Sequence, residues 1–290
     1  MAQTTNLNVS PYFDDFNADD NYYKVLFKPG VPVQARELTG LQSILQNQIA
    51  KFGQHFFKEG SKVIPGNTSY IDNYDCVEIN NEYLGVTVES YIDQLLNRKI
   101  VGLVSGISAT IVKVLSSTNS ERGNLTLYIQ YESSGDINTD QNTFSDGENL
   151  AANIDIISGP ESSAFIPTGE SFATTISSNA TSTGAAFSIA DGVYFVRGNF
   201  VTVNAETIIL SQYSNTPTGR VGLRILEETI NSDEDANLTD NSKGFNNFAA
   251  PGADRLKISC SLSLKGEEDF NDNDFVELAS FRNGDVKAKT

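Results

Sequence analysis

The chain of 290 residues carries 37 acidic and 20 basic residues, which gives it a net charge of −17 at pH 7. Such an acidic chain repels phosphates, which argues against a surface that binds nucleic acid or anionic lipid. Hydrophobic residues make up 39% of the chain, with 17 Phe and 11 Tyr, so a disordered polymer is excluded as well.

Residues 1–32 are predicted to form an extended arm rich in aromatic and acidic residues. The aromatic anchors of this arm are Tyr12, Phe13, Phe16 and Tyr22. Aromatic side chains on an extended segment need a surface on which to pack. That surface is either the body of the same chain, which is the commoner case, or a neighbouring subunit.

Residues 33–60 contain the only strong helical pattern in the chain. Apolar side chains recur there at spacings of three and four residues and form one stripe. The stripe consists of Leu38, Leu41, Leu45, Ile49, Phe52 and Phe56. It either packs on a sheet of the same chain or, from Leu38 to Phe52, forms the seam of a helix bundle around a molecular axis. At under four heptads, the stripe is too short to assign a coiled coil from the pattern alone.

The remainder of the chain has the composition and alternation of β-strands. Residues 61–90 are predicted to be a β connection, residues 91–157 an inserted small β module, and residues 158–290 a β domain. The sequence therefore predicts a mainly β protein with one long N-terminal amphipathic helix. Its sheets are expected to form several small antiparallel modules of the barrel or sandwich type.

Within residues 158–290, turn residues separate the predicted strands. The clearest hairpin has its turn at Gly198-Asn199, and Asn283-Gly284 predicts a second one near the end of the sequence. Between two alternating strands, Asn231–Ala250 is a long acidic excursion that we expect to wrap over a surface. Because the last strand is short, we expect the chain to continue beyond residue 290 in a longer protein, or a partner strand to complete the sheet.

Candidate catalytic groups are scarce in this sequence. The sole histidine, His55, lies near the end of the predicted helix, and no nucleophile elbow or phosphate-binding loop occurs. A pair of carboxylates for glycoside hydrolysis is not excluded by sequence, but Trp, which often forms sugar platforms, is absent. Cys76 and Cys260 do not form a disulfide framework or a zinc motif. We therefore expect no enzymatic activity and no cofactor.

Three acidic loops have the alternating oxygen ligands with which a calcium loop begins. They are Asp15, Asn17 and Asp19; Asp233, Asp235 and Asn237; and Asp269, Asn271 and Asn273. None of these loops continues with the glycine at position six and the glutamate at position twelve that an EF-hand requires. We interpret all three as solvated turns and expect no metal site.

No run of about 18 apolar residues occurs, so we expect no membrane insertion. Residues 1–10 lack a basic region followed by an apolar run, so we expect no signal peptide.

Three stretches of the chain resemble a known family. They are Ser10–Phe16 with its continuation through Tyr22–Gly30 to Leu38, then Asp191–Gly198, and then Ala249–Leu256. Together they resemble an uncharacterised domain of virion structural proteins, from the baseplate or tail fibre of contractile-tailed bacteriophages that include cyanophages. The resemblance covers both ends of the chain, while residues 90–155 look like an inserted module.

This resemblance implies a structural protein of the virion tail that is synthesised in the bacterial cytoplasm. By analogy with phage fibres it implies a homotrimer, with other baseplate or fibre proteins as further partners. In this hypothesis, the arm and the predicted helix attach the protein to the baseplate or to its sister subunits. One alternative is a receptor-binding module that contacts host surface glycans, and a weaker one is a tailspike that degrades polysaccharide.

Overall fold

The computed structural model describes residues 3–133, 141–158, 164–270 and 272–289. These residues form a mainly β protein with one α-helix, α1 (Ala35–Phe56), which lies near the N-terminus, and several antiparallel sheets. The predicted fold class is therefore confirmed. Short 3-10 helices occur at η1 (Ala18–Asp20), η2 (Val88–Ser90), η3 (Ile92–Leu95) and η4 (Ala236–Leu238).

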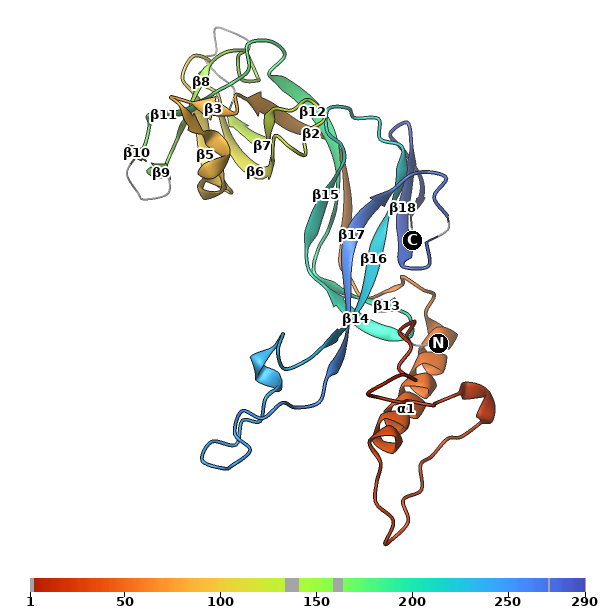
Figure 1. Cartoon of the computed structure of the whole chain (residues 1–290). Coiled ribbons are helices and arrows are strands. Elements are labelled where there is room, and N and C mark those ends of the chain that lie inside the picture. The colour runs from red at the N-terminus through yellow and green to blue at the C-terminus, as the bar shows by residue number, and fades with distance from the viewer. Residues whose placement is uncertain (1–2, 134–140, 159–163, 271, 290) are drawn as a thin grey trace.

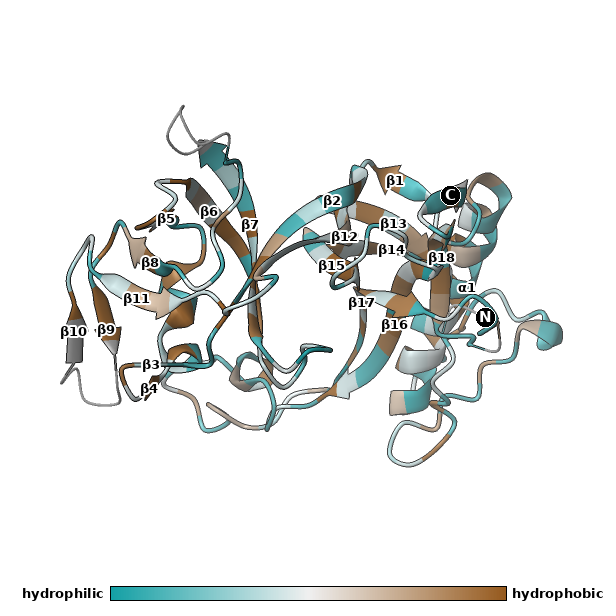
Figure 2. Ribbon diagram, turned by 90° about the horizontal axis from the view of Figure 1, so that it is seen from above, coloured by the Kyte–Doolittle hydropathy of each residue, from teal (hydrophilic) through white to brown (hydrophobic). Residues whose placement is uncertain are grey.

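The largest sheet has eight antiparallel strands. In spatial order they are β11 (Ser171–Thr174), β8 (Asn149–Ala152), β5 (Lys99–Gly102), β6 (Ser108–Leu115), β7 (Leu125–Ser133), β2 (Thr68–Ile79), β12 (Thr181–Ile189) and β15 (Glu206–Ser211). Strands β2 and β12 pair from Thr68↔Ile189 to Val77↔Thr181. Seen from above, the strands form two groups, and β2 and β12 run from one group to the other (Figure 2).

The other sheets are smaller. A four-stranded sheet has the order β17 (Arg255–Lys265), β16 (Gly219–Ile230), β18 (Phe275–Arg282) and β19 (Asp285–Lys289). A three-stranded sheet consists of β1 (Lys62–Ile64), β13 (Gly192–Val196) and β14 (Asn199–Val203). Two pairs complete the set, β9 (Ile156–Ser158) with β10 (Ala164–Ile166) and β3 (Glu82–Tyr83) with β4 (Val86–Thr87).

Two large hydrophobic cores follow one another along the sequence. The first contains buried residues from Val77 to Ala180 and is covered on one side by η2 and η3. The second contains buried residues from Ala185 to Phe281. Val221, Leu223 and Ile225, which are every second residue of β16, all lie in this second core, as their period of two predicts.

Two details of the β domain differ from the sequence prediction. The β13–β14 turn is centred on Arg197 and Gly198, one residue earlier than predicted, because these two residues have the positive φ angles that a tight hairpin turn requires. The predicted Asn283-Gly284 turn is confirmed. Residues Asn231–Ala250 do not wrap over a surface but extend away from the body between β16 and β17, and residues 241–250 are all exposed (Figure 1).

The ends of α1 follow from local chemistry. At its start the backbone N–H of Gln34 donates to the Glu37 carboxylate at 3.0 Å, which satisfies one of the free donors of the first turn. After the last turn of α1, Gly60 has a φ of +81°, a left-handed value that glycine adopts easily, and the chain turns into β1. No helix in the described ranges has the length and apolarity needed to cross a membrane.

Candidate assembly site

Helix α1 turns a row of large apolar side chains toward solvent. The row, which we call the α1 stripe, consists of Leu38, Leu45, Ile49, Phe52 and Phe56. Their exposed fractions lie between 51% and 68%. Leu41, the sixth member of the predicted set, is half-buried at the edge of the row. The interpretation that this stripe packs on the chain's own sheet is therefore wrong.

Helix α1 packs on the body of the protein at Gly53, which is buried, as are Ile44 and Ala50. A Cβ atom on Gly53 would lie only 2.5 Å from Cε2 of Phe195, so the helix can approach β13 this closely only because residue 53 has no side chain. Beyond the helix, the Phe57 ring contacts the Phe195 ring with centroids 5.7 Å apart. Gly53 was the sequence signal for this packed face, and it was missed.

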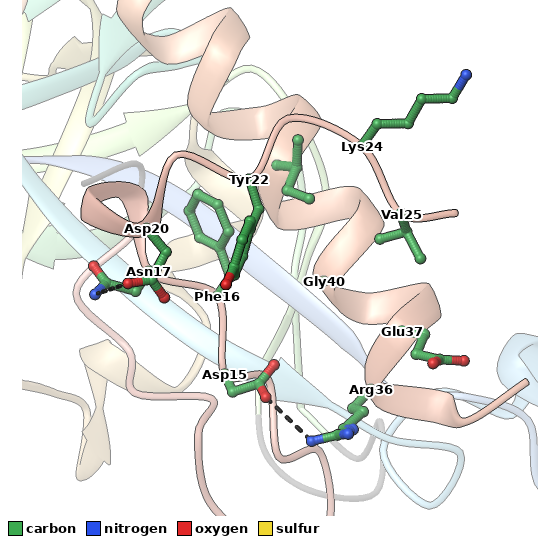
Figure 3. A pocket seen from close by; sticks show the side chains of 11 residues that line it. Asp15, Phe16, Asn17, Asp20, Tyr22, Lys24, Val25, Arg36, Glu37 and Gly40 are labelled. Atoms are coloured by element: carbon green, nitrogen blue, oxygen red, sulfur yellow. Dashed lines mark hydrogen bonds and ion pairs between the residues drawn. The ribbon is translucent and has the colours of Figure 1, made fainter. Parts of the chain in front are cut away.

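The arm is fixed to α1 by its two adjacent aspartates. Asp14 is buried and accepts a hydrogen bond from the Ser43 hydroxyl. Asp15 forms an ion pair with Arg36 at 3.2 Å, at the edge of a cavity of about 390 Å³ between the arm and the helix (Figure 3). Both contacts hold the arm on the side of the helix that faces away from the α1 stripe.

The four predicted aromatic anchors divide into two pairs. Tyr12 and Phe16 are half-buried, and the Tyr12 hydroxyl donates to the Asp254 carboxylate at 2.5 Å. Phe13 and Tyr22 remain mostly exposed. The arm therefore packs on its own chain through the first pair and leaves the second pair free.

The N-terminal segment is held by a charged cluster that sequence reasoning missed. Glu227 on β16 accepts hydrogen bonds from the backbone N–H and the hydroxyl of Thr5, at 2.8 and 2.7 Å, and from Arg197 at 2.5 Å. Arg197 also pairs with Asp274, and the side chains of Arg197 and Glu227 are only 9% and 4% exposed. Burial raises the pKa of Glu227, but hydrogen bonds from Thr5, Thr4 and Arg197 outweigh it and lower the pKa to about 2.

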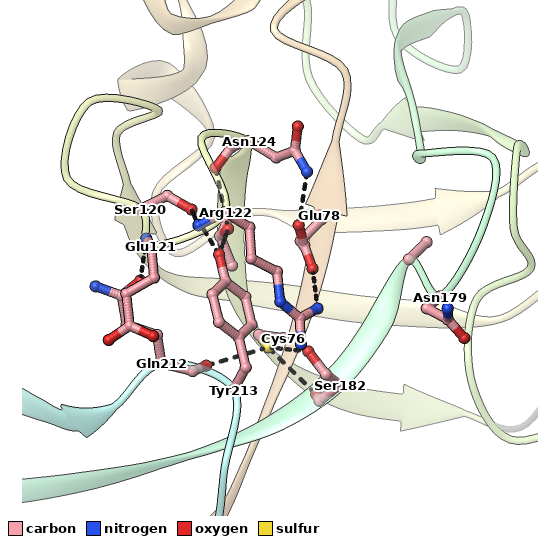
Figure 4. A network of polar contacts seen from close by, with 12 residues as sticks. Cys76, Glu78, Ser120, Glu121, Arg122, Asn124, Asn179, Ser182, Gln212 and Tyr213 are labelled. Carbon is pink, nitrogen blue, oxygen red and sulfur yellow. Dashed lines mark hydrogen bonds and ion pairs between the residues drawn. The ribbon is translucent and has the colours of Figure 1, made fainter.

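Polar side chains on the face of β2 that points away from the first core pair with one another (Figure 4). The buried Glu78 carboxylate accepts from Arg122 at 2.6 Å and from Asn124 at 2.8 Å. The Cys76 thiol lies 3.2 Å from the carbonyl oxygen of Ser182, and burial raises the pKa of this thiol. A buried thiol with a raised pKa stays protonated, so this network is suited to holding β2 and its neighbours together rather than to nucleophilic attack.

The remaining candidate groups lie apart from one another. His55 is exposed on α1, with its ring against that of Phe56. In two of the acidic loops the predicted ligands form turns: Asn17 accepts from the backbone of Asp19, and Asp235 accepts from that of Asn237. Over the described ranges, no cluster of three or more His, Cys, Asp or Glu is placed to hold a metal ion. Asn271 of the third loop lies outside the described residues.

The stretches that carry the family resemblance meet at the end of the molecule occupied by α1. The bond from Tyr12 to Asp254 joins the first stretch to the last, although 242 positions separate them. Arg197 of the middle stretch donates at 3.0 Å to the hydroxyl of Thr4, which precedes the first stretch in the chain. This end, with the α1 stripe beside it, is the candidate assembly site.

A family model described as a domain of unknown function, DUF4815, matches residues 10–106 and 170–290. The two matched segments contain α1, residues 10–32 of the arm, and Arg197, Glu227 and Asp274 of the charged cluster. No curated protein and no solved structure matches the chain.

Proposed function

We propose that this chain, which belongs to the DUF4815 family, is a structural component of a bacteriophage tail, in a tail fibre or baseplate. In this proposal it acts by assembly with copies of itself and with other tail proteins, and it catalyses no reaction. The tail location is inferred from the resemblance of residues 10–38, 191–198 and 249–256 to virion proteins. The assembly role is inferred from the α1 stripe.

The exposure of the α1 stripe is the observation that carries the proposed self-assembly. Five large apolar side chains in one row are costly to leave in water, and such patches on otherwise polar surfaces mark interaction sites. Burying one such side chain contributes about 1.5–3 kcal/mol. A partner that covers the row therefore stabilises the complex substantially.

The spacing of the stripe favours identical helices as the partner. Within the α1 stripe, Leu38, Leu45 and Phe52 recur every seven residues, and Ile49 and Phe56 recur at the same interval. From Leu45 through Ile49 and Phe52 to Phe56, the steps are four, three and four residues. The a and d positions of a parallel coiled coil alternate with the same steps. Copies of α1 placed in register around an axis would bury the whole α1 stripe of each copy.

Charge does not oppose this association along the helix. Although the chain carries a net charge of −17, the only Asp, Glu, Lys or Arg residues between 35 and 56 are Arg36, Glu37 and Lys51. Identical copies would repel one another over most of their acidic surface, but α1 is close to neutral. The trimeric state of the proposal comes from the resemblance to fibre proteins.

Immunogold electron microscopy of the phage that encodes the chain tests the tail location. An antibody raised against the purified chain is expected to label the tail or its baseplate in intact particles. Label in infected-cell lysate but on no purified particle would contradict the proposal. Heads of the same particles serve as the internal control.

A further inference from the structure

Two segments project from the end of the molecule at which α1 lies. The first, which we call the arm loop, is residues 21–33 between η1 and α1. The second, the excursion, is residues 231–250 between β16 and β17. Figure 1 shows the two segments on opposite sides of this end, the excursion in blue and the arm loop in red to orange. They are therefore far apart within one chain.

The arm loop presents a basic and aromatic surface. Tyr22 is 71% exposed, and Tyr23, Leu26 and Phe27 are exposed beside it. Residues 21–33 contain Lys24 and Lys28 but no acidic residue, which makes the loop positive in a strongly negative protein. Within the described part of the chain, neither lysine forms an ion pair, and Figure 3 shows Lys24 pointing away from the helix.

The excursion presents an acidic and aromatic surface. Phe245 is 75% exposed, and Phe248 is also exposed. The excursion contains one basic residue, Lys243, and four acidic residues, which are Asp233, Glu234, Asp235 and Asp240. None of these four carboxylates forms an ion pair with a described residue.

Backbone hydrogen bonds give the excursion a defined shape before any partner binds. The N–H of Asp240 donates to the carbonyl oxygen of Ala250 at 2.8 Å, and that of Ala249 donates back to Asp240 at 2.8 Å. A preorganised segment loses less conformational entropy on docking than a disordered one.

We infer that the excursion of one copy docks on the arm loop of the neighbouring copy. The charges are opposite, both surfaces are rich in exposed aromatic side chains, and their separation prevents them from meeting within one chain. A contact between two different surfaces of identical chains is heterologous, and it closes into a ring when copies are related by rotation about an axis. This inference rests on the proposed self-assembly, because the α1 stripes would supply that axis.

The proposed contact would give the assembly its specificity. Stripes of apolar side chains associate with little directional preference, whereas opposite charges at the rim select one orientation and increase the rate of encounter. The excursion and the arm loop would thus ensure that the copies of α1 meet in parallel.

Cross-linking of isotope-labelled protein tests this contact directly. Equal amounts of ¹⁴N and ¹⁵N full-length chain are mixed, unfolded, refolded together and treated with a carbodiimide, which joins a lysine to a carboxylate that touches it. Mixed-isotope peptides that link Lys24 or Lys28 to the excursion are expected. An oligomer without such peptides overturns the docking but leaves the self-assembly intact, whereas a monomer overturns both.

Charge reversal provides an independent second measurement. Lys24→Glu with Lys28→Glu is expected to raise the concentration needed for assembly by about tenfold, and adding Asp233→Lys with Glu234→Lys is expected to restore it. Arg98→Glu with Lys287→Glu, at exposed positions outside both segments, changes the net charge equally and is the matched control. Equal weakening in the control, or no restoration by the second pair, overturns the inference.

Discussion

Ile44 and Leu45 are neighbours in α1, yet Ile44 is 5% exposed and Leu45 is 56% exposed. Successive residues of a helix point about 100° apart, so the two side chains lie on different faces. Ile44 lines the cavity between the arm and the helix, and Leu45 belongs to the α1 stripe. Helix α1 is thus apolar on a second face that the rest of the chain does not cover.

Replacement of Leu45 tests the role of the stripe. Leu45→Asp is expected to prevent oligomer formation, because a carboxylate buried in the seam would lose its hydration without gaining a partner. The β content should stay unchanged, since Leu45 is exposed in the single chain. Light scattering after size-exclusion chromatography measures the first effect and circular dichroism the second.

Gln54→Asp is the matched control for this replacement. Gln54 lies nine residues after Leu45, which places it on the other side of the helix, and it is also exposed. This variant is expected to assemble like the unmodified chain. If both variants assemble normally, α1 is not the seam.

The packed face of α1 gives a prediction about stability. Gly53→Ala is expected to lower the free energy of unfolding by about 1–3 kcal/mol, because the new methyl group would overlap the fully buried ring of Phe195. Gly40→Ala, where the nearest atom would be Oδ1 of Asp14 at 3.8 Å, should instead be neutral or stabilising by up to about 1 kcal/mol. Chemical denaturation measures both, and equal losses would contradict the proposed packing.

The cluster around Glu227 predicts a loss of stability in acid. The folded pKa of Glu227 is lowered from 4.5 to about 2, so its carboxylate contributes stability above pH 4.5 that is lost as the pH falls toward 2. This contribution is on the order of 3 kcal/mol. Glu227→Gln is expected to flatten the dependence of the unfolding free energy on pH over this range. Glu228→Gln, which removes the neighbouring carboxylate outside the cluster, should keep the dependence steep.

The bond from Tyr12 to Asp254 predicts the local stability of the arm. The backbone N–H groups of Tyr12, Phe13 and Asp14 are bonded within the arm and should exchange slowly with solvent. Tyr12→Phe removes about 1 kcal/mol of hydrogen bonding, which corresponds to roughly fivefold faster exchange of these amides. Tyr23→Phe removes a hydroxyl that donates to Asn21 within the arm loop, so it should leave their exchange unchanged.

Local patterns in the sequence predicted the secondary structure well. Alternation at Val221, Leu223 and Ile225 identified a strand, the spacing from Leu38 to Phe56 identified α1, and Asn283-Gly284 identified a hairpin. Each of these features depends on residues close together in the chain. Propensity and periodicity are informative at that range.

The orientation of α1 could not be predicted in the same way. Both faces of the helix carry apolar or small residues, and Phe195, which selects the packed face at Gly53, lies more than 140 positions away. The cluster of Glu227 with Arg197 and Thr5 likewise joins residues from three distant parts of the chain. Such contacts are set by tertiary structure, which a single sequence does not reveal through local patterns.

The solution mass of the unmodified chain tests self-assembly most directly. Light scattering coupled to size-exclusion chromatography is expected to give three times the 31.5 kDa of one chain, because three copies of α1 would then cover their stripes. A single species of 31.5 kDa at every concentration tested would contradict the proposed assembly.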